Sequence, residues 1–537
     1  MGDYEVDIEH DVRIAAADGV ELLADVYHPI GADPCPTILE RTPYGRAMFA
    51  GGNRAAASHG YHVVAQDCRG SGGSAGDPSF FAEGSDGRAA GDWIARQPWF
   101  NGQLAACGGS YLGFTACAFA ATRPPYLAAL CVSLFGSERR RSWYPGGSFA
   151  LDIALPWSQV RVATRDGLFA AANLEQITRS MAKMNEALGR ALVHLPLCEA
   201  DRIAVDETLP WYQEWLHHDQ PGDPYWTALD YSRIIPDLGV PVLLTDGWYD
   251  YQLPYMLEDH RRLVAAGVPT RLVIGPWAHA TTDGVVGQDE MLAFLDAHLK
   301  GDRARLRPRK VRVFVMPDRG WREYDCWPPP RAPVQWYLHE NGALAPSLPR
   351  ESAPDGYAYD PMDPTPAAGG TGLRPPPNSG PVDNRELEAR SDVLTYTSDA
   401  LEHDVEVLGE VHADLYVTSS SRYTDFFVRL CDVDPDGRSI NVCDGLLRVG
   451  PDLGEVDDDG VTHLHVPLWD TAFRFAVGHR LRVQVSSGAH PRFARNLGSG
   501  EPLATATTTI VQHQQIFHDP RHRSAISLNV SAEGADD

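Results

Sequence analysis

One turn constrains the fold of this chain more than any other feature. The apolar run Leu104–Cys107 is followed, after two glycines, by Ser110, and a small-residue helical stretch begins at once with Tyr111. A strand that turns into a helix within three residues predicts a nucleophile elbow, where small neighbours let the chain fold back and expose a serine. Ser110 is therefore the candidate nucleophile.

A second serine fits the GxSxG pattern more literally, within Gly72-Gly73-Ser74-Ala75-Gly76. Asp77-Pro78 follow it and no helix begins there, so we expect Ser74 in a glycine-rich loop rather than at an elbow. The same loop imitates a dinucleotide fingerprint, but pyrophosphate binding requires a helix N-terminus directly after the glycines. No nucleotide cofactor is therefore expected at this loop.

Strands and helices alternate on both sides of the elbow. The expected strands are Pro36–Glu40, Tyr61–Asp67, Val240–Thr245 and Thr270–Ile274. Such alternation predicts an α/β domain with a mostly parallel sheet and helices on both faces. Between the second and third of these strands lies the elbow, and after it helical periodicity replaces strand-like runs over residues 139–238. We expect residues 1–138 and 239–305 to form one domain, with 139–238 inserted as a helical cap.

The sequence pattern changes beyond about Gly301. Short β-rich runs follow one another between clusters of Pro, Gly and Asp, and the helical periodicity is gone. Examples are Val311–Val315, Gln335–Leu338 and Val405–Tyr416. This pattern predicts a jelly-roll-like β-sandwich over residues 306–537.

The charge balance excludes several classes of partner. The chain has 46 basic and 72 acidic side chains, for a formal net charge of −26. This balance argues against binding to nucleic acid and to anionic membrane surfaces, which both attract clustered Lys and Arg. The three lysines, Lys183, Lys300 and Lys310, do not follow a GxxxxG run, so a phosphate-binding P-loop is excluded. Small molecules are the expected substrates.

Targeting and metal signals are also missing from the sequence. Met1–His10 has no apolar core, so we expect no signal peptide, and no run of about 18 apolar residues predicts a membrane span. The nine cysteines are scattered without a CxxC pair, which is typical of free thiols in a reducing cytoplasm. HExxH-type signatures are absent, so no metal or other cofactor is expected. A homo-oligomer is compatible with all of these features.

A serine nucleophile requires a base, and the base requires a carboxylate that orients it. In α/β-hydrolase folds these residues follow one another in the order serine, acid, histidine. Asp246 and Asp250 both come directly after a predicted strand, and either could be the acid. His279 follows the next strand, behind a rigid Gly-Pro turn, where its side chain can reach a crevice at the sheet edge.

Five motifs in order resemble the cocaine-esterase-like hydrolases, which are relatives of the X-Pro dipeptidyl-peptidases and the α-amino-acid ester hydrolases. They are Arg41-Thr42-Pro43-Tyr44-Gly45, Gln66-Asp67-Cys68-Arg69-Gly70, Gly108 to Gly113, Gly247-Trp248-Tyr249-Asp250 and Gly275-Pro276-Trp277-Ala278-His279. The resemblance spans nearly the whole chain. It implies an α/β-hydrolase domain with a helical cap and a C-terminal jelly-roll-like β-sandwich.

The resemblance also implies roles for single residues. Ser110 would be the nucleophile, His279 the general base and then acid, and Asp250, rather than Asp246, the orienting acid. The oxyanion hole would consist of the Tyr44 hydroxyl and the backbone amide of Tyr111.

The substrate-binding residues implied by the resemblance are Trp143 and Trp157 of the cap and Phe426 of the sandwich. Gln252 stands where the cocaine-esterase branch has an aromatic residue. A polar side chain at this position argues against a preference for aromatic acyl groups.

We expect a serine esterase that cleaves small carboxylic esters through an acyl-enzyme. The first alternative keeps the same triad in an X-Pro dipeptidyl-peptidase or an α-amino-acid ester hydrolase or acylase. Such an enzyme needs acidic groups for the substrate ammonium, and the cap offers Glu199, Asp201, Asp206 and Glu207. The second alternative is a non-catalytic binding protein that uses its sandwich, since fold does not imply function.

Overall fold

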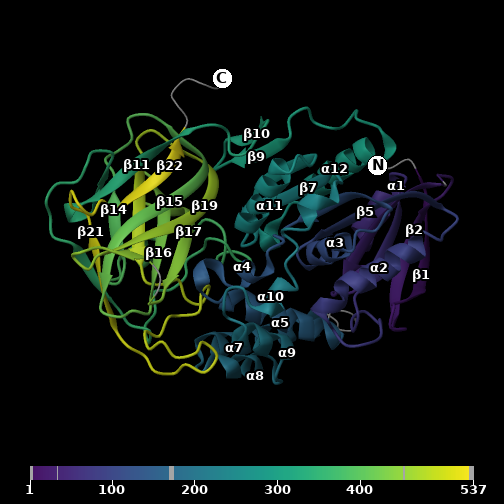
Figure 1. Ribbon diagram of the computed structural model, residues 1–537, viewed down its shortest axis with the longest axis horizontal. Coiled ribbons are helices and arrows are strands. Elements are labelled where there is room, and N and C mark those ends of the chain that lie inside the picture. Colours follow the sequence, from purple (N-terminus) through teal and green to yellow (C-terminus); the bar gives the residue numbers. More distant parts are fainter. Residues whose placement is uncertain (1–3, 33, 169–173, 452–453, 531–537) are drawn as a thin grey trace.

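The computed structural model describes residues 4–32, 34–168, 174–451 and 454–530. The first half forms an α/β domain with a helical cap and the second half a β-sandwich, which lies at the left of Figure 1. Both architectures agree with the sequence-based expectation.

The first sheet has ten strands in the order β1-β2-β4-β3-β5-β6-β7-β8-β9-β10. Its strands from β4 to β9 along this order are parallel, and antiparallel pairs close both edges. The bounds are β1 (Val6–Ala15), β2 (Glu21–Pro29), β3 (Cys35–Thr42), β4 (His62–Asp67), β5 (Phe100–Gly109), β6 (Leu127–Ser133), β7 (Val242–Tyr249), β8 (Thr270–Ala278), β9 (Val311–Val315) and β10 (Gly320–Tyr324).

Helices cover both faces of this sheet because neighbouring strand residues point to opposite sides. Ile38 packs into a cluster with α1 (Ala50–Ser58) and α12 (Gly284–Leu295). The next residue, Leu39, packs into the cluster that contains α3 (Tyr111–Ala121) and α11 (Leu253–Ala265). The helix α2 (Glu83–Ile94) packs against α3. Each large apolar side chain that is fully buried in this way contributes ~1.5–3 kcal/mol.

One strand lies in a different sheet from the one expected. Val311–Val315 was predicted as part of the sandwich, but it forms β9 and pairs in parallel with β8 of the first sheet. Its hairpin partner β10 closes that edge. Without these two strands, β8 would expose an unpaired ladder of backbone groups.

The cap consists of helices, as its periodicity predicts. They are α4 (Arg139–Trp143), α5 (Leu151–Arg165), α7 (Leu174–Val193), α8 (Ala200–Val205), α9 (Pro210–His217) and α10 (Pro224–Thr227). The cap lies below the sheet and beside the sandwich in Figure 1.

The sandwich is built from long, mostly antiparallel strands, and β15 alternates buried and half-exposed residues along much of its length. The strands are β11 (Ala332–His339), β12 (Ala343–Ala345), β13 (Asp355–Tyr359), β14 (Leu394–Thr397), β15 (Val405–Ser419), β16 (Thr424–Val433), β17 (Ser439–Val449), β18 (Glu455–Val456), β19 (Thr462–Phe475), β20 (Arg480–Ser486), β21 (Gln512–Phe517) and β22 (Ala525–Val530).

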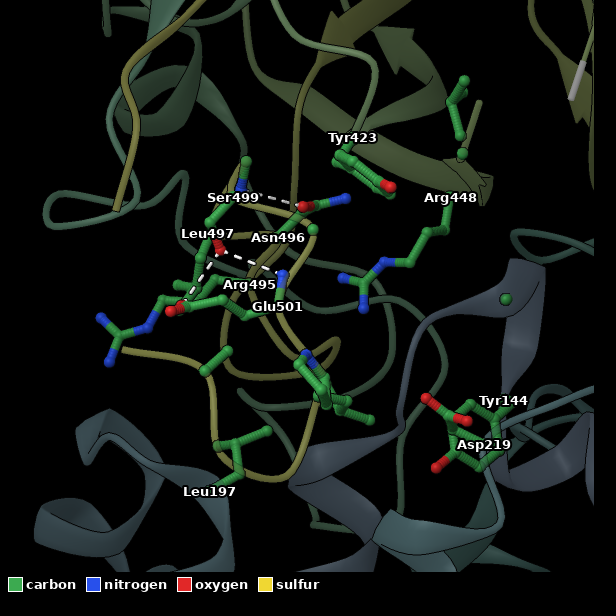
Figure 2. A pocket seen from close by; sticks show the side chains of 18 of the residues that line it. Tyr144, Leu197, Asp219, Tyr423, Arg448, Arg495, Asn496, Leu497, Ser499 and Glu501 are labelled. Carbon is green, nitrogen blue, oxygen red and sulfur yellow. Dashed lines mark hydrogen bonds between the residues drawn. The ribbon is translucent and has the colours of Figure 1, made fainter. Parts of the chain in front are cut away.

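Polar contacts tie the sandwich to the rest of the chain. Arg374 pairs with Asp152 of the cap at 2.7 Å. A cavity of about 720 Å³ lies between cap and sandwich. Figure 2 shows this cavity, with Arg448 and the loop 495–501 of the sandwich across from Tyr144 and Asp219 of the cap.

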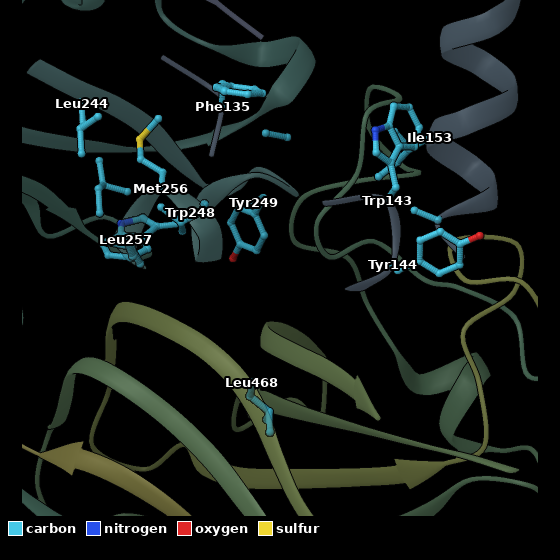
Figure 3. Close-up of a cluster of buried hydrophobic side chains, with 14 of the residues drawn as sticks. Phe135, Trp143, Tyr144, Ile153, Leu244, Trp248, Tyr249, Met256, Leu257 and Leu468 are labelled. Carbon is cyan, nitrogen blue, oxygen red and sulfur yellow. The ribbon is translucent and has the colours of Figure 1, made fainter. Parts of the chain in front are cut away.

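The hydrophobic core continues from the sheet into the cap and the sandwich. Figure 3 shows Tyr249 and Phe135 of the α/β domain, Trp143 of the cap and Leu468 of the sandwich around the same region. All four side chains are buried and belong to one cluster. The three parts of the chain therefore share a core.

Gly146 sits where the cap meets the sandwich, and we predict that Gly146→Ala lowers the melting temperature. This residue has φ +58°, and a Cβ there would collide with the Leu446 carbonyl oxygen of β17. The backbone strain alone costs roughly 1–3 kcal/mol. Differential scanning calorimetry measures the effect.

The matched control is Gly189→Ala in α7, where a Cβ meets no atom within 4 Å. Alanine there is expected to raise stability by roughly 0.5–1 kcal/mol, since glycine weakens a helix interior. Equal melting temperatures for Gly146→Ala and the unmodified protein would contradict the proposed close contact.

Candidate active site

Ser110 lies at a sharp turn between β5 and α3, as the sequence predicts. Its backbone has φ 57° and ψ −122°, a conformation that a non-glycine residue rarely adopts. The Ser110 amide donates to the Ser133 carbonyl of β6 at 2.8 Å. A Cβ on Gly108 would lie 2.4 Å from the backbone carbonyl of Leu112, so this position before the turn requires glycine.

A buried ionic network supports the helix that starts at this turn. The Tyr111 hydroxyl donates to Glu83 Oε1 at 2.8 Å. Arg41 pairs with Glu83 Oε2 at 2.8 Å, and both side chains are almost fully buried. Thr115 of α3 donates to the Arg41 carbonyl at 3.0 Å. The network fixes α3, and with it Ser110, against β3 and α2.

His279 bridges Ser110 and Asp250. Its Nε2 lies 2.9 Å from Ser110 Oγ, and its Nδ1 lies 2.6 Å from Asp250 Oδ2. Asp250 is fully buried, and its other carboxylate oxygen, Oδ1, accepts a hydrogen bond from the backbone N–H of Gln252 at 2.7 Å. Since an ionised carboxylate only accepts, Nδ1 carries the proton and Nε2 can accept the serine proton.

The structure separates the two candidate acids. Asp246 does not contact His279; its Oδ1 accepts the Gly247 amide at 2.7 Å, and its Oδ2 has no partner among the described residues. Burial and the nearby Asp250 charge raise the pKa of Asp246 well above its ordinary value. The raised pKa favours the neutral form of the Asp246 carboxyl.

Tyr44 lies beside the elbow, after β3, and its ring is 6.4 Å from that of Tyr111. Trp157 of α5 donates its indole N–H to the Tyr44 hydroxyl oxygen at 2.9 Å. Burial raises the pKa of Tyr44, so the hydroxyl keeps its proton. Because the oxygen already accepts from Trp157, the O–H is available to donate elsewhere. The Tyr111 amide opens α3, where first-turn amides have no partner within the helix.

Aromatic rings line the cap side of this region. The two predicted tryptophans come together: Trp143 lies 6.4 Å from Trp157, ring to ring. Trp157 in turn stacks on Tyr111 at 5.9 Å. Trp215, which sequence reasoning missed, stacks on Trp143 at 4.0 Å. An aromatic residue in a predicted helix usually indicates core packing, so no pattern in the sequence singles out Trp215.

The other two predicted substrate-binding residues lie outside this aromatic group. Gln252 is buried, and its Oε1 accepts the Gly136 amide at 3.3 Å. Phe426 is buried on β16 and pairs in register with Leu447. No ring contact joins Phe426 to the tryptophans among the described residues.

Three of the four cap acids, and Ser74, have polar partners elsewhere. Glu199 pairs with His194, and Glu207 with Arg165. Asp201 is buried and accepts the Leu209 amide at 2.8 Å, while Asp206 ends α8 in a left-handed conformation. Ser74 Oγ donates to the Asp67 carbonyl and accepts the Leu23 amide, both at 2.9 Å, in a loop without a following α-helix until Glu83.

Two groups of side chains outside the candidate active site could hold a metal ion. Their ligand atoms lie within 4.8 Å of one another; they are His412, Asp414 and His465, and Asp457, Asp459 and His522. Among the described residues, no helix is both long and apolar enough to cross a membrane.

Comparisons with known proteins agree with this architecture. Residues 18–281 match the X-Pro dipeptidyl-peptidase (S15) family, and residues 306–527 match the X-Pro dipeptidyl-peptidase C-terminal non-catalytic domain. An aminopeptidase from a marine sediment Thaumarchaeota archaeon superposes with a TM-score of 0.82 at 23% identity, over 99% of this chain and 97% of that one. An α-amino acid ester hydrolase superposes with a TM-score of 0.81 at 21% identity, with the same coverage.

At the level of sequence, the chain is 32% identical to the cocaine esterase of Rhodococcus sp. strain MB1 Bresler, over 99% of this chain and the whole of that protein. This likeness covers both the α/β domain and the sandwich. The chain belongs to the cocaine-esterase-like family of serine hydrolases, which is related to the X-Pro dipeptidyl-peptidases.

Proposed function

We propose that this hydrolase cleaves small carboxylic esters through an acyl-enzyme on Ser110. The observation that carries the proposal is the pair of hydrogen bonds at His279, which accepts from Ser110 Oγ at 2.9 Å and donates to Asp250 Oδ2 at 2.6 Å. This arrangement has the geometry that activates a serine, because the base contacts the nucleophile and a buried carboxylate orients the base.

The chemistry follows from the two nitrogens of His279. Nε2 takes the Ser110 proton as Oγ attacks the ester carbonyl carbon, and Asp250 stabilises the imidazolium that forms. His279 then returns the proton to the leaving alcohol, and the acyl group stays on Ser110. Water attacks this acyl-enzyme by the same route, which releases the carboxylic acid and restores the free serine.

Two donors would stabilise the tetrahedral oxyanion. The Tyr44 hydroxyl has its oxygen occupied by Trp157, so its proton can be donated to the substrate. The Tyr111 amide, at the start of α3, would supply the second hydrogen bond. One such donor typically accounts for ~2.7–4 kcal/mol of transition-state stabilisation.

An X-Pro peptidase or α-amino-acid ester hydrolase would use the same triad. Similarity to a cocaine esterase and to the X-Pro dipeptidyl-peptidase family is compatible with either esters or X-Pro peptides as substrates. A substrate ammonium, however, needs carboxylates near the nucleophile, and Glu199, Asp201 and Glu207 have partners elsewhere in the cap. We therefore favour esters without an α-amino group.

Parallel assays on p-nitrophenyl butyrate and an X-Pro p-nitroanilide test this choice. We predict rapid ester turnover and weak amide turnover, with the ester rate lost by roughly 10⁴- to 10⁶-fold in Ser110→Ala. Ser74→Ala is the matched control and should keep the ester rate, because Ser74 only braces a loop. Strong amide turnover with negligible ester turnover would contradict the proposal.

Tyr44→Phe tests the oxyanion role. This change removes the donor and keeps the ring, so we predict that kcat falls by about 10²–10³-fold while KM changes little. Steady-state kinetics on p-nitrophenyl butyrate separate the two constants. A rise in KM alone would assign Tyr44 to substrate binding instead.

A further inference from the structure

Arg139, at the start of α4, is a buried cation that the mechanism above does not use. It is 5% exposed, and its guanidinium carbon lies 5.2 Å from the Phe114 ring centre, 5.8 Å from that of Phe135 and 5.0 Å from that of Trp143. The guanidinium has no hydrogen bond or ion pair with any residue in the described part of the chain. Rings are its only partners there.

The absence of a carboxylate partner is unusual, because an unpaired buried charge is costly. The neighbouring arginines in the run 139–141 both have a polar partner. Arg140 donates to the Asp219 carbonyl, and Arg141 pairs with Glu258 at 2.5 Å. The adjacent acid, Glu138, is 3.0 Å from Arg262. Arg139 is thus the member of the run that turns inward without an anion.

Its position connects Arg139 to the candidate active site. Phe114 lies one turn after Ser110 on α3, with its amide 3.1 Å from the Ser110 carbonyl. Trp143 packs against Trp157, which binds the Tyr44 hydroxyl. The charge of Arg139 acts on Tyr44, whose pKa it lowers against the larger effect of burial. Arg139 is therefore linked to Ser110 through Phe114, and to Tyr44 through Trp143 and Trp157.

The donors at this place are not all used by the protein. The Trp143 indole N–H is buried and has no partner among the described residues. Arg139 is only 5% exposed, but its guanidinium nitrogens are not completely shielded from solvent. A carboxylate that reaches Arg139 could accept two parallel hydrogen bonds from its planar guanidinium.

We infer that Arg139 is a specificity residue that receives a carboxylate on the acyl part of the substrate. The substrate class would be monoesters of dicarboxylic acids. Hydrolysis would release the alcohol first, with the acyl group and its free carboxylate left on Ser110, and water would then release the dicarboxylate. The inference rests on the proposed esterase function and names its substrate. A cation at this place would also repel a substrate ammonium.

The test compares three methyl esters of similar length, followed by NMR release of methanol: monomethyl glutarate, methyl pentanoate and methyl 4-aminobutanoate. We predict that kcat/KM falls in that order, with the anionic ester preferred over the neutral one by about 10- to 100-fold, as expected for a hydrogen bond between charged groups. This order is measured on the unmodified enzyme and does not depend on a variant that folds.

Variants then assign the preference to one side chain. In Arg139→Met the ratio of kcat/KM between the anionic and neutral esters should fall toward one, and Arg139→Lys should restore part of it. Arg140→Met, from the same helix, should keep the full ratio. The Arg140 guanidinium contacts Tyr144 and Asp219 at the cavity between cap and sandwich. A preserved ratio in Arg139→Met would overturn the inference.

Two further outcomes are separable. Turnover of methyl pentanoate without a preference for monomethyl glutarate would overturn the inference and leave the esterase proposal standing. No turnover of any ester would refute the esterase proposal itself. A carboxylate preference only on the alcohol side, shown by 3-acetoxypropanoate over propyl acetate, would contradict the acyl assignment.

Discussion

The hydrogen bond between His279 and Asp250 is the interaction on which the proposed chemistry depends. It joins the residues that follow two neighbouring parallel strands, β7 and β8, and it points the other imidazole nitrogen at the turn after β5. Because parallel strands end at the same edge of a sheet, residues 110, 250 and 279 meet there despite their separation in sequence. That edge is fixed in position by the sheet, by the helices on both of its faces and by the buried Arg41–Glu83 pair.

Charge is distributed unequally around this hydrogen bond. Asp250 faces His279, while burial and the Asp250 charge raise the pKa of Asp246, four residues earlier, well above its ordinary value. A second ionised carboxylate would compete for the imidazole proton and add a buried charge without a partner. On the cap side, Arg139 supplies a positive charge that the described residues leave unpaired, which suits an anionic acyl group better than an ammonium.

Local patterns in the sequence predict the elbow, the alternation of strands and helices around it and the position of His279 after a strand. Ser110 is recognisable because glycines and an apolar run surround it, and Ser74 is recognisably different because no helix follows. The sequence alone leaves Asp246 and Asp250 open, since both follow the same strand and only three-dimensional contact with His279 separates them. The resemblance selects Asp250, which is the acid that His279 contacts in the structure.

Long-range packing sets the limit of such reasoning. Val311–Val315 has the same β-rich pattern as the sandwich strands, and its place in the first sheet depends on the free edge of β8. Arg139 sits in a run of three arginines, and no local pattern shows that its guanidinium is the one buried among aromatic rings. Phe426 lies on a sandwich strand, as expected, but has no ring contact with the tryptophans among the described residues. Which side chains meet in the cap depends on contacts between segments far apart in the chain.

Covalent labelling shows whether Ser110 is the nucleophile. The enzyme is incubated with a fluorophosphonate until ester turnover stops, and peptide mapping by tandem mass spectrometry locates the adduct. We predict one phosphonyl group per chain on Ser110, with no adduct formed by Ser110→Ala. An adduct on Ser74 or another serine, or full turnover without any adduct, would contradict it.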